Sequence, residues 1–161
     1  MLTIRAATAD DVPLLNTLIH ELAEYERLAH ETSVTEEDIL RDGFGANPKF
    51  RALIAEWDGQ LAGYALHFDF YSTFQGRAGL FLEDIFVRPQ FRKKGIGKAM
   101  LLHLAKVAVE KGCARFEWQV LDWNTPSIEF YKSLGAEVMK EWLTMRVTGE
   151  ALEKLAAQAA K

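Results

Sequence analysis

The spacing of apolar residues predicts a buried strand that runs directly into an amphipathic helix. Six of the eight residues 80–87 are apolar, which is typical of a strand covered on both faces. Apolar residues then recur at helical spacing between positions 96 and 108, on the far side of a basic loop. Glu83 and Asp84 interrupt the strand, where a carboxylate is costly unless it has a partner or a task. We therefore expect the chemistry of this chain to lie around this strand.

A β-hairpin is predicted before this strand. Strands over 50–57 and 61–71 are joined by Asp58-Gly59, a pair typical of a two-residue turn. In the second of these strands, the even positions are apolar. His67, Asp69 and Tyr71 share the other face, and we expect that face to look into a cleft.

The rest of the chain alternates between helical and extended patterns. A capping-box-like pair, Thr35 and Asp38, marks the start of one helix, and Gly112 closes the helix after the basic loop. The expected fold class is α/β, a mixed sheet with helices on both faces, in a single domain over residues 1–161. The remaining predicted elements are strands over 2–7 and 115–121, helices over about 10–28, 124–135 and 149–160, and a last strand or pair of strands over 137–147.

Composition narrows the function classes. The apolar content of 49% over 161 residues is ample for a core, and no run of about 18 apolar residues or targeting segment is present, so we expect a soluble cytoplasmic protein. The single cysteine, Cys113, excludes a disulfide framework, and the four histidines lack the spacing of metal ligands. We therefore predict no metal.

Charge is distributed unevenly. Residues 1–42 hold ten acids and three bases, a net charge of −7, whereas the remainder is +3. The acidic part is either a solvated helix face or the wall of a site for a cationic substrate. The basic residues form one short cluster rather than a long stripe, so we expect no nucleic-acid partner, and we expect no membrane partner either.

The basic cluster lies at a predicted helix N-terminus. Arg92, Lys93 and Lys94 precede Gly95 and Gly97, and cations are disfavoured there unless an anion is present. The residues that a Walker loop and a dinucleotide fingerprint require after these glycines are absent. What remains is either a pyrophosphate cradle, in which two glycines let the backbone approach the ligand, or a solvated turn.

These residues carry a resemblance to a known superfamily. The Arg-x-x-Gly-x-Gly turn over 92–97, with the later Asn124-x-x-Ser127-x-x-x-Tyr131 followed by Gly135-Ala136, resembles the two motifs of the GNAT superfamily of N-acetyltransferases. The resemblance implies the GNAT fold, with a mixed, mostly antiparallel twisted sheet of about six or seven strands, and acetyl-CoA as cosubstrate. The implied acetyl-CoA-binding residues are Ile85, Phe86, Val87, Arg92, Lys93, Lys94, Gly95, Ile96, Gly97, Lys98, Asn124, Ser127 and Tyr131.

A narrower resemblance concerns the substrate. The stretches 21–26, 42–45, 71–73, 82–87 and 121–124 are similar to the diamine acetyltransferases, which include the spermidine/spermine and thialysine enzymes. This implies a homodimer and a small cationic amine: a diamine, a polyamine or a lysine analogue. The sequence departs from these relatives near the presumed substrate face, with Phe74 in place of Trp and Asp69 in place of an aromatic residue.

The resemblance implies direct attack of the amine on the thioester. An amine as basic as lysine, with a pKa of about 10.4, must first lose a proton. Glu83 is the candidate base, directly or through water, unless a neighbour ties up its carboxylate. Asp84 should face the other way unless a bulge intervenes, and such a bulge would also separate this strand from the next. Tyr131 is the candidate proton donor, unless it is only a core tyrosine.

Further residues and alternatives follow from the same resemblance. Tyr25, Glu26, Glu83 and Asp84 are the expected substrate-binding residues. Acetylation of another amine, such as an amino acid or an antibiotic, is one alternative function. A non-catalytic acyl-CoA-binding regulatory module is the other, because a fold does not fix a function.

Overall fold

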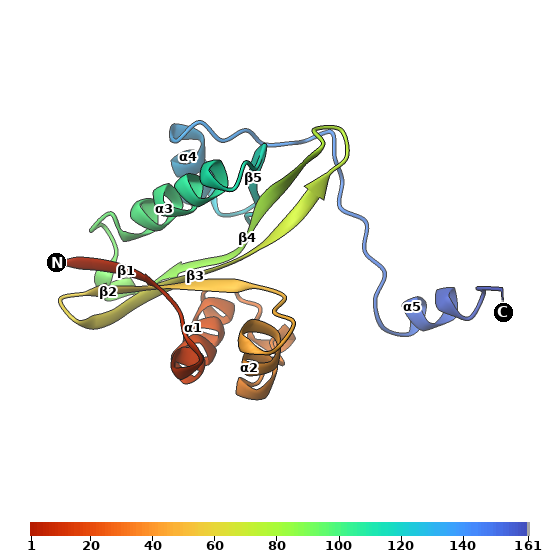
Figure 1. The fold of residues 1–161 in the computed structure, drawn as a ribbon, viewed down its shortest axis with the longest axis horizontal. Helices are drawn as coiled ribbons and strands as arrows, with labels where there is room; N and C mark the ends of the chain where they lie inside the picture. The colour runs from red at the N-terminus through yellow and green to blue at the C-terminus, as the bar shows by residue number, and fades with distance from the viewer. Residues whose placement is uncertain (161) are drawn as a thin grey trace. The chain divides into compact units, whose positions relative to one another are not determined.

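The computed structural model describes residues 1–160, which form two compact units that are described separately. The first unit, Met1–Leu121, contains the whole sheet, and the second begins at Asp122. Figure 1 shows the elements in chain order. They are β1 (Leu2–Ala6), α1 (Val12–Tyr25), α2 (Glu36–Phe44), β2 (Arg51–Trp57), β3 (Gln60–Ser72), β4 (Arg77–Val87), α3 (Ile96–Glu110) and β5 (Arg115–Trp118) in the first unit, and α4 (Thr125–Ser133) and α5 (Gly149–Ala156) in the second.

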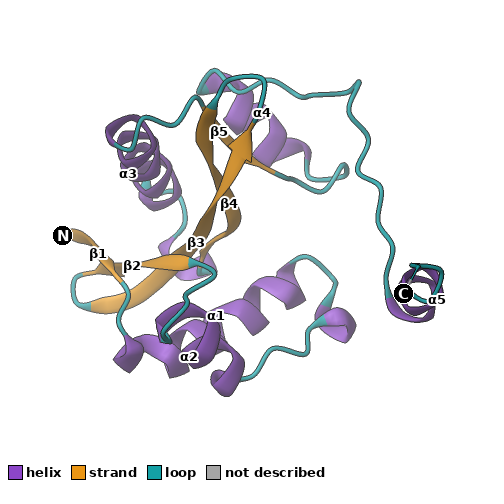
Figure 2. Ribbon diagram, turned by 45° about the vertical axis from the view of Figure 1, so that its right-hand side comes forward, coloured by secondary structure: helices purple, strands orange, loops and turns teal. Residues whose placement is uncertain are grey.

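The sheet is mixed and mostly antiparallel, as predicted. Its five strands lie in the order β1-β2-β3-β4-β5, and only the β4–β5 pair is parallel. Within the first unit, α1 and α2 cover one face of the sheet and α3 covers the other (Figures 1 and 2). Both faces are therefore buried, which explains the nearly continuous apolar run of β4.

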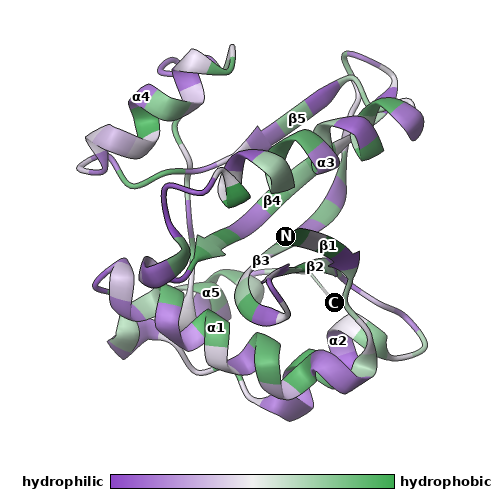
Figure 3. Ribbon diagram, turned by 90° about the vertical axis from the view of Figure 1, so that its left-hand side faces the viewer, coloured by the Kyte–Doolittle hydropathy of each residue, from purple (hydrophilic) through white to green (hydrophobic). Residues whose placement is uncertain are grey.

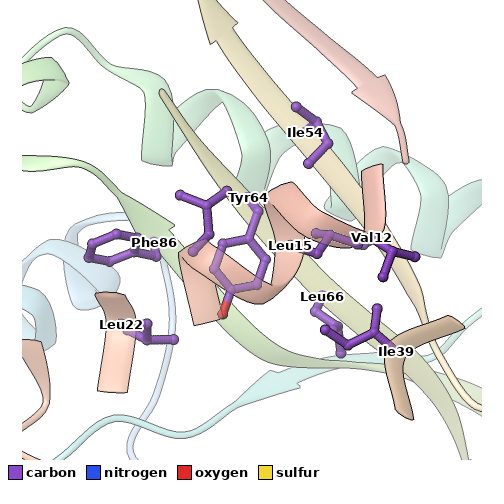
Figure 4. Close-up of a cluster of buried hydrophobic side chains, with 10 residues drawn as sticks. Val12, Leu15, Leu22, Ile39, Ile54, Tyr64, Leu66 and Phe86 are labelled. Carbon is purple, nitrogen blue, oxygen red and sulfur yellow. The ribbon is translucent and has the colours of Figure 1, made fainter. Parts of the chain in front are cut away.

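The core between α1 and the sheet explains why this helix forms. Apolar residues recur along one side of α1, and Figure 3 shows them alternating with polar residues around the helix. Leu15 and Leu18 are fully buried, as are Ile54 and Tyr64 from the strands beneath (Figure 4). Burial of each such side chain contributes about 1.5–3 kcal/mol. This packing fixes the height of α1 above β3 and β4.

Two local interactions fix where the first helices begin. Thr35 and Asp38 form the predicted capping box, with the Asp38 amide donating to the Thr35 hydroxyl at 3.2 Å. The helix α1 begins at Val12 instead of at about residue 10, because residues 9–11 form a 3₁₀ turn. Asp11 accepts two hydrogen bonds from Arg5, at 2.8 and 2.9 Å, and a third from the amide of Thr8. This ties the helix start to β1.

The predicted strand count of six or seven is too high. Residues 137–147 form no strand, and among residues 1–160 the sheet has five strands. Trp142, Leu143 and Met145 are 71–88% exposed, although their apolar character favoured a buried strand. A strand needs a neighbour to complete its hydrogen-bond ladder, and the second unit contains none. No helix within residues 1–160 is long and apolar enough to span a membrane.

Candidate active site

The loop between β4 and α3 has the conformation of an anion cradle. Gly95, at the N-terminal boundary of α3, has a φ of 77°, the left-handed region that glycine adopts without strain. No side chain caps this end of the helix. A Cβ added at Gly95 would have no atom within 4 Å, and one at Gly97 would meet only Val87 Cγ2, at 3.9 Å. The backbone amides of the first turn are thus bordered by open space.

The predicted cradle residues do not all face this space. Lys93, Lys94 and Lys98 are exposed, whereas Ile96 is 1% exposed, so only the backbone of Ile96 can contribute to a site on the loop. Arg92 turns toward α1: its Nε donates to the carbonyl of Val87 at 3.0 Å. Its guanidinium also lies 4.6 Å from the centre of the Tyr25 ring. The arginine of the motif therefore joins the loop to the end of α1.

The edge of β4 opens beside this loop. The parallel pairing of β4 with β5 runs from Gly79 to Leu82 and stops there. Ile85, Phe86 and Val87 remain paired with β3 but have no strand partner on the β5 side within the described chain. Such an edge can hydrogen-bond to an extended amide-bearing ligand. The end of the β4–β5 pairing at Leu82 confirms the expected separation of these two strands.

A β-bulge at Glu83 lies where this separation begins and sets the directions of the two acids. Leu66 pairs with Asp84 and His67 pairs with Leu82, so Glu83 is an extra residue in β4. Asp84 consequently lies on the α1 side of the sheet, where the hydroxyl of Tyr64 donates to its Oδ2 at 2.8 Å. Asp84 is expected to face away from Glu83 unless a bulge intervenes, and this bulge is present. Bulges of this kind redirect side chains beside active sites.

Three carboxyl groups influence one another at this point. Burial raises the pKa of Asp84 to about 6; the Tyr64 hydrogen bond opposes this, and the charges of Glu83 and Glu26 add to it. Burial and the charge of Glu83 also raise the pKa of Glu26, which follows the last residue of α1. None of the groups that act on Asp84 is a cation. A cationic ligand would therefore supply the positive charge that these three carboxyl groups lack.

Two hollows lie beside the acids. Asp84 and Glu26 line a cavity of about 210 Å³ with residues of α1 and the turn that follows it. Tyr25, Phe86 and Arg92 line a second hollow of about 530 Å³ with residues of α1 and the β4–α3 loop. The second hollow thus brings one predicted substrate residue, Tyr25, next to one residue of the predicted cradle, Arg92.

Sequence reasoning missed the ion pair that holds this arrangement together. Arg88 Nε and Nη2 donate to the carboxylate of Glu21 at 3.0 and 2.9 Å, which ties the β4–α3 loop to α1. Glu21 lies within the stretch 21–26 and Arg88 directly follows the stretch 82–87, both of which resemble the diamine acetyltransferases. No rule of sequence spacing predicts an ion pair between residues so far apart in the chain. Sequence reasoning also missed Tyr64, which the alternation of β3 identified only as apolar.

The opposite face of β3, where the alternation predicted a cleft, is covered at His67. His67 is 6% exposed and lies near α3, where burial and the charge of Lys111 lower its pKa to about 4. Asp69 accepts a hydrogen bond from Lys111 at 2.5 Å. α3 therefore covers this face at His67, whereas Tyr71 is 65% exposed, so the expectation of a cleft is wrong at His67 and stays a prediction at Tyr71.

Three predicted site residues belong to the second unit. Asn124 caps α4, and its side-chain oxygen accepts from the amide of Ser127 at 3.4 Å. Tyr131 is half-buried on the same helix, with its ring 5.6 Å from that of Phe130. Their roles in binding and proton donation stay predictions. Among residues 1–160, no group of three or more His, Cys, Asp or Glu side chains could hold a metal ion.

Comparisons with known proteins show the family of this chain. Residues 15–136 match the acetyltransferase (GNAT) family model. Thialysine N-epsilon-acetyltransferase of Mus musculus is 43% identical over 96% of this chain and 97% of its own length. An L-ornithine N5-acetyltransferase of Arabidopsis thaliana is 34% identical over 94% of this chain and 86% of its own length.

Solved structures show the same fold. An integron cassette protein from the mobile metagenome of V. cholerae superposes with a TM-score of 0.80 at 26% identity, over 96% of this chain and 97% of its own. An aminoglycoside acetyltransferase from a soil metagenome has a TM-score of 0.77 at 15% identity, over 92% of this chain and 97% of its own. At that identity the second likeness concerns the fold alone.

Proposed function

Because the chain belongs to the acetyltransferase (GNAT) family and is an N-acetyltransferase acting on amines, we propose that it transfers an acetyl group directly from acetyl-CoA to a small cationic amine. The proposed acceptors are a diamine, a polyamine or a lysine analogue such as thialysine. The observation that carries the proposal is the bulge that places Glu83 and Asp84 beside Glu26, next to the open edge of β4.

The first unit has features that suit acetyl-CoA. The backbone amides at the start of α3, with Lys93, Lys94 and Lys98 around them, would hold its pyrophosphate. The unpaired edge over residues 85–87 would bind the amides of its pantetheine arm. Asn124, Ser127 and Tyr131 are proposed to contribute from the second unit. When bound, acetyl-CoA supplies the thioester that the amine attacks.

The acid cluster suits the amine. A protonated amine is attracted by neighbouring carboxylates and must lose a proton before it can attack. Glu26, Glu83 and Asp84 supply the charge, and Tyr25 lies at the end of the same helix. We propose that the bulge pair, Glu83 and Asp84, binds the ammonium and accepts its proton, and that Tyr131 returns a proton to the departing sulfur.

A thiol-release screen tests this function. The protein would be incubated with acetyl-CoA and, separately, with spermidine, putrescine, thialysine, lysine and an aminoglycoside. We expect amine-dependent release of free thiol, faster with spermidine, putrescine or thialysine than with lysine or the aminoglycoside. Binding of acetyl-CoA without thiol release for any amine would contradict the proposal and indicate a binding module.

The resemblance supports three further proposals. We propose that the two units act together as one domain, that the protein is a homodimer and that it is cytoplasmic. Light scattering coupled to size-exclusion chromatography measures the molar mass directly. A mass of twice the 18.2 kDa chain is expected, and a monomer at working concentration would refute the dimer.

A further inference from the structure

The buried hydroxyl of Tyr64 has an unusual partner. Tyr64 lies on β3 among Leu15, Leu66 and Phe86, and none of its surface is exposed (Figure 4). Buried tyrosine hydroxyls need a hydrogen-bond partner, and a backbone carbonyl of the core would suffice. Here the partner is Oδ2 of Asp84, at 2.8 Å. One oxygen of the Asp84 carboxylate is therefore fixed by a hydrogen bond from a residue of the core.

The two acids of the bulge are held differently. Asp84 is fixed by Tyr64 and lines the cavity of about 210 Å³ together with Glu26. Glu83 is exposed and does not line this cavity. A general base must present an oxygen at a fixed position to the proton that it removes. Asp84 meets this requirement better than Glu83.

We propose that Asp84 is the proton acceptor for the incoming amine and that Tyr64 is the positioning residue that orients its carboxylate. This inference rests on the proposed acetyl transfer, and it assigns the acceptor role within the bulge pair to one residue. Glu83, in this assignment, attracts and holds the cationic substrate.

The proton and bond changes balance. An N–H proton of the ammonium moves to the carboxylate of Asp84, and the neutral nitrogen attacks the thioester carbonyl. The C–N bond forms as the C–S bond breaks, the nitrogen loses its second proton to solvent to give the neutral amide, and the sulfur takes a proton from the donor assigned to Tyr131. Asp84 then gives its proton to solvent, which restores the carboxylate, and Tyr131 regains one from solvent.

The electrostatics of the cluster support this role. A base works best when its pKa lies near the working pH, and burial brings the pKa of Asp84 to about 6. Tyr64, Glu83, Glu26 and Glu31 are the titratable groups that face it from β3, β4 and the end of α1 with its following turn. The Tyr64 hydrogen bond favours the charged carboxylate, so removing it should raise the pKa of Asp84 further.

The test compares Tyr64→Phe, Asp84→Asn and Glu83→Gln with the wild type. Thr3→Val is the matched control, because it removes a hydroxyl from an exposed position on another strand of the same sheet. The first readout is the pH profile of kcat/KM for amine acetylation. A hydrogen bond to a charged group typically changes a pKa by about one unit. Tyr64→Phe should therefore move the acidic limb up by about one pH unit, while the Thr3→Val profile overlays the wild type.

The other two variants separate the roles of the acids. Asp84→Asn should lower kcat about 100-fold or more, the usual contribution of a general base. Glu83→Gln should raise KM for the amine and keep the acidic limb. A Tyr64→Phe profile that overlays the wild type, or loss of the limb in Glu83→Gln instead of Asp84→Asn, would overturn the assignment.

A second readout does not depend on activity. A ¹³C NMR titration of aspartate carboxyls, with Asp84 identified by its absence in Asp84→Asn, measures the pKa of Asp84 directly. We expect a midpoint near 6 in the wild type and a higher one in Tyr64→Phe. Equal midpoints would refute the role of Tyr64. A wild type that acetylates no amine would instead refute the proposed function, whatever the titration shows.

Discussion

Two buried groups on opposite faces of β3 and β4 should oppose each other in the pH dependence of stability. Asp84 ionises with a pKa of about 6 in the folded protein and 3.8 ordinarily. Its protonated form stabilises the fold below pH 3.8, and this contribution is lost as the pH rises through 6. His67 titrates at about 4 instead of its ordinary 6.5. Its neutral form stabilises the fold above pH 6.5, and this contribution is lost as the pH falls through 4.

The two contributions are similar in size. Each pKa unit corresponds to about 1.4 kcal/mol, so the shifts amount to at most about 3 kcal/mol for Asp84 and about 3.5 kcal/mol for His67. Because their windows overlap between pH 4 and 6, the free energy of unfolding of the wild type should change little there. Asp84→Asn removes the first contribution and should make stability rise with pH across this window. His67→Gln removes the second and should make stability fall with pH.

Urea denaturation followed by tryptophan fluorescence, at half-unit intervals from pH 4 to 6.5, measures these slopes. Comparing slopes of three proteins cancels the titration of all other groups that they share. The reasoning would be refuted if the three curves ran parallel, or if Asp84→Asn and His67→Gln tilted in the same direction.

Three further predictions concern the cradle, the proton donor and the core. The double variant Gly95→Val and Gly97→Val should abolish coenzyme A binding in calorimetry. The valine side chains would block approach to the backbone amides, and Gly95 has a positive φ that valine does not adopt without strain. Tight binding by this variant would count against the cradle. Tyr131→Phe should lower kcat far more than it weakens acetyl-CoA binding, and an unchanged rate would remove Tyr131 as the donor. Leu15→Ala should cost about 2–5 kcal/mol of unfolding free energy because Leu15 is fully buried, whereas Leu14→Ala, at a position 38% exposed, should cost much less; equal losses would contradict the packing of α1.

Local sequence signals predicted the parts of the fold that depend on neighbouring residues. The capping box at Thr35, the Asp58-Gly59 turn and the helix after Gly95 all formed where their patterns indicated. These features depend on interactions within a few residues, so the sequence specifies them directly. The last strands failed for the opposite reason: residues 137–147 are apolar enough for a sheet, but a ladder requires a partner that local sequence does not name.

The site was predictable in its residue types and less so in its geometry. Two adjacent acids in an apolar strand indicated a task, and the possibility of a bulge followed from that pattern. The register that leaves Glu83 unpaired is set by pairing with β3, so the direction of Asp84 could not be read from β4 alone. The roles of Tyr64 and of the Arg88–Glu21 pair depend on contacts between distant segments in the same way.

In the proposed reaction, an acetyl group passes directly to an amine at the acid cluster. The measurement that tests it most directly is a single-turnover reaction with acetyl-labelled acetyl-CoA, the best amine of the screen, and mass spectrometry of both amine and protein. We predict one N-acetylated amine for each thiol released, no acetyl group on the protein, and loss of product in Asp84→Asn. Thiol release without acetylated amine, or label that passes through the protein, would contradict the account.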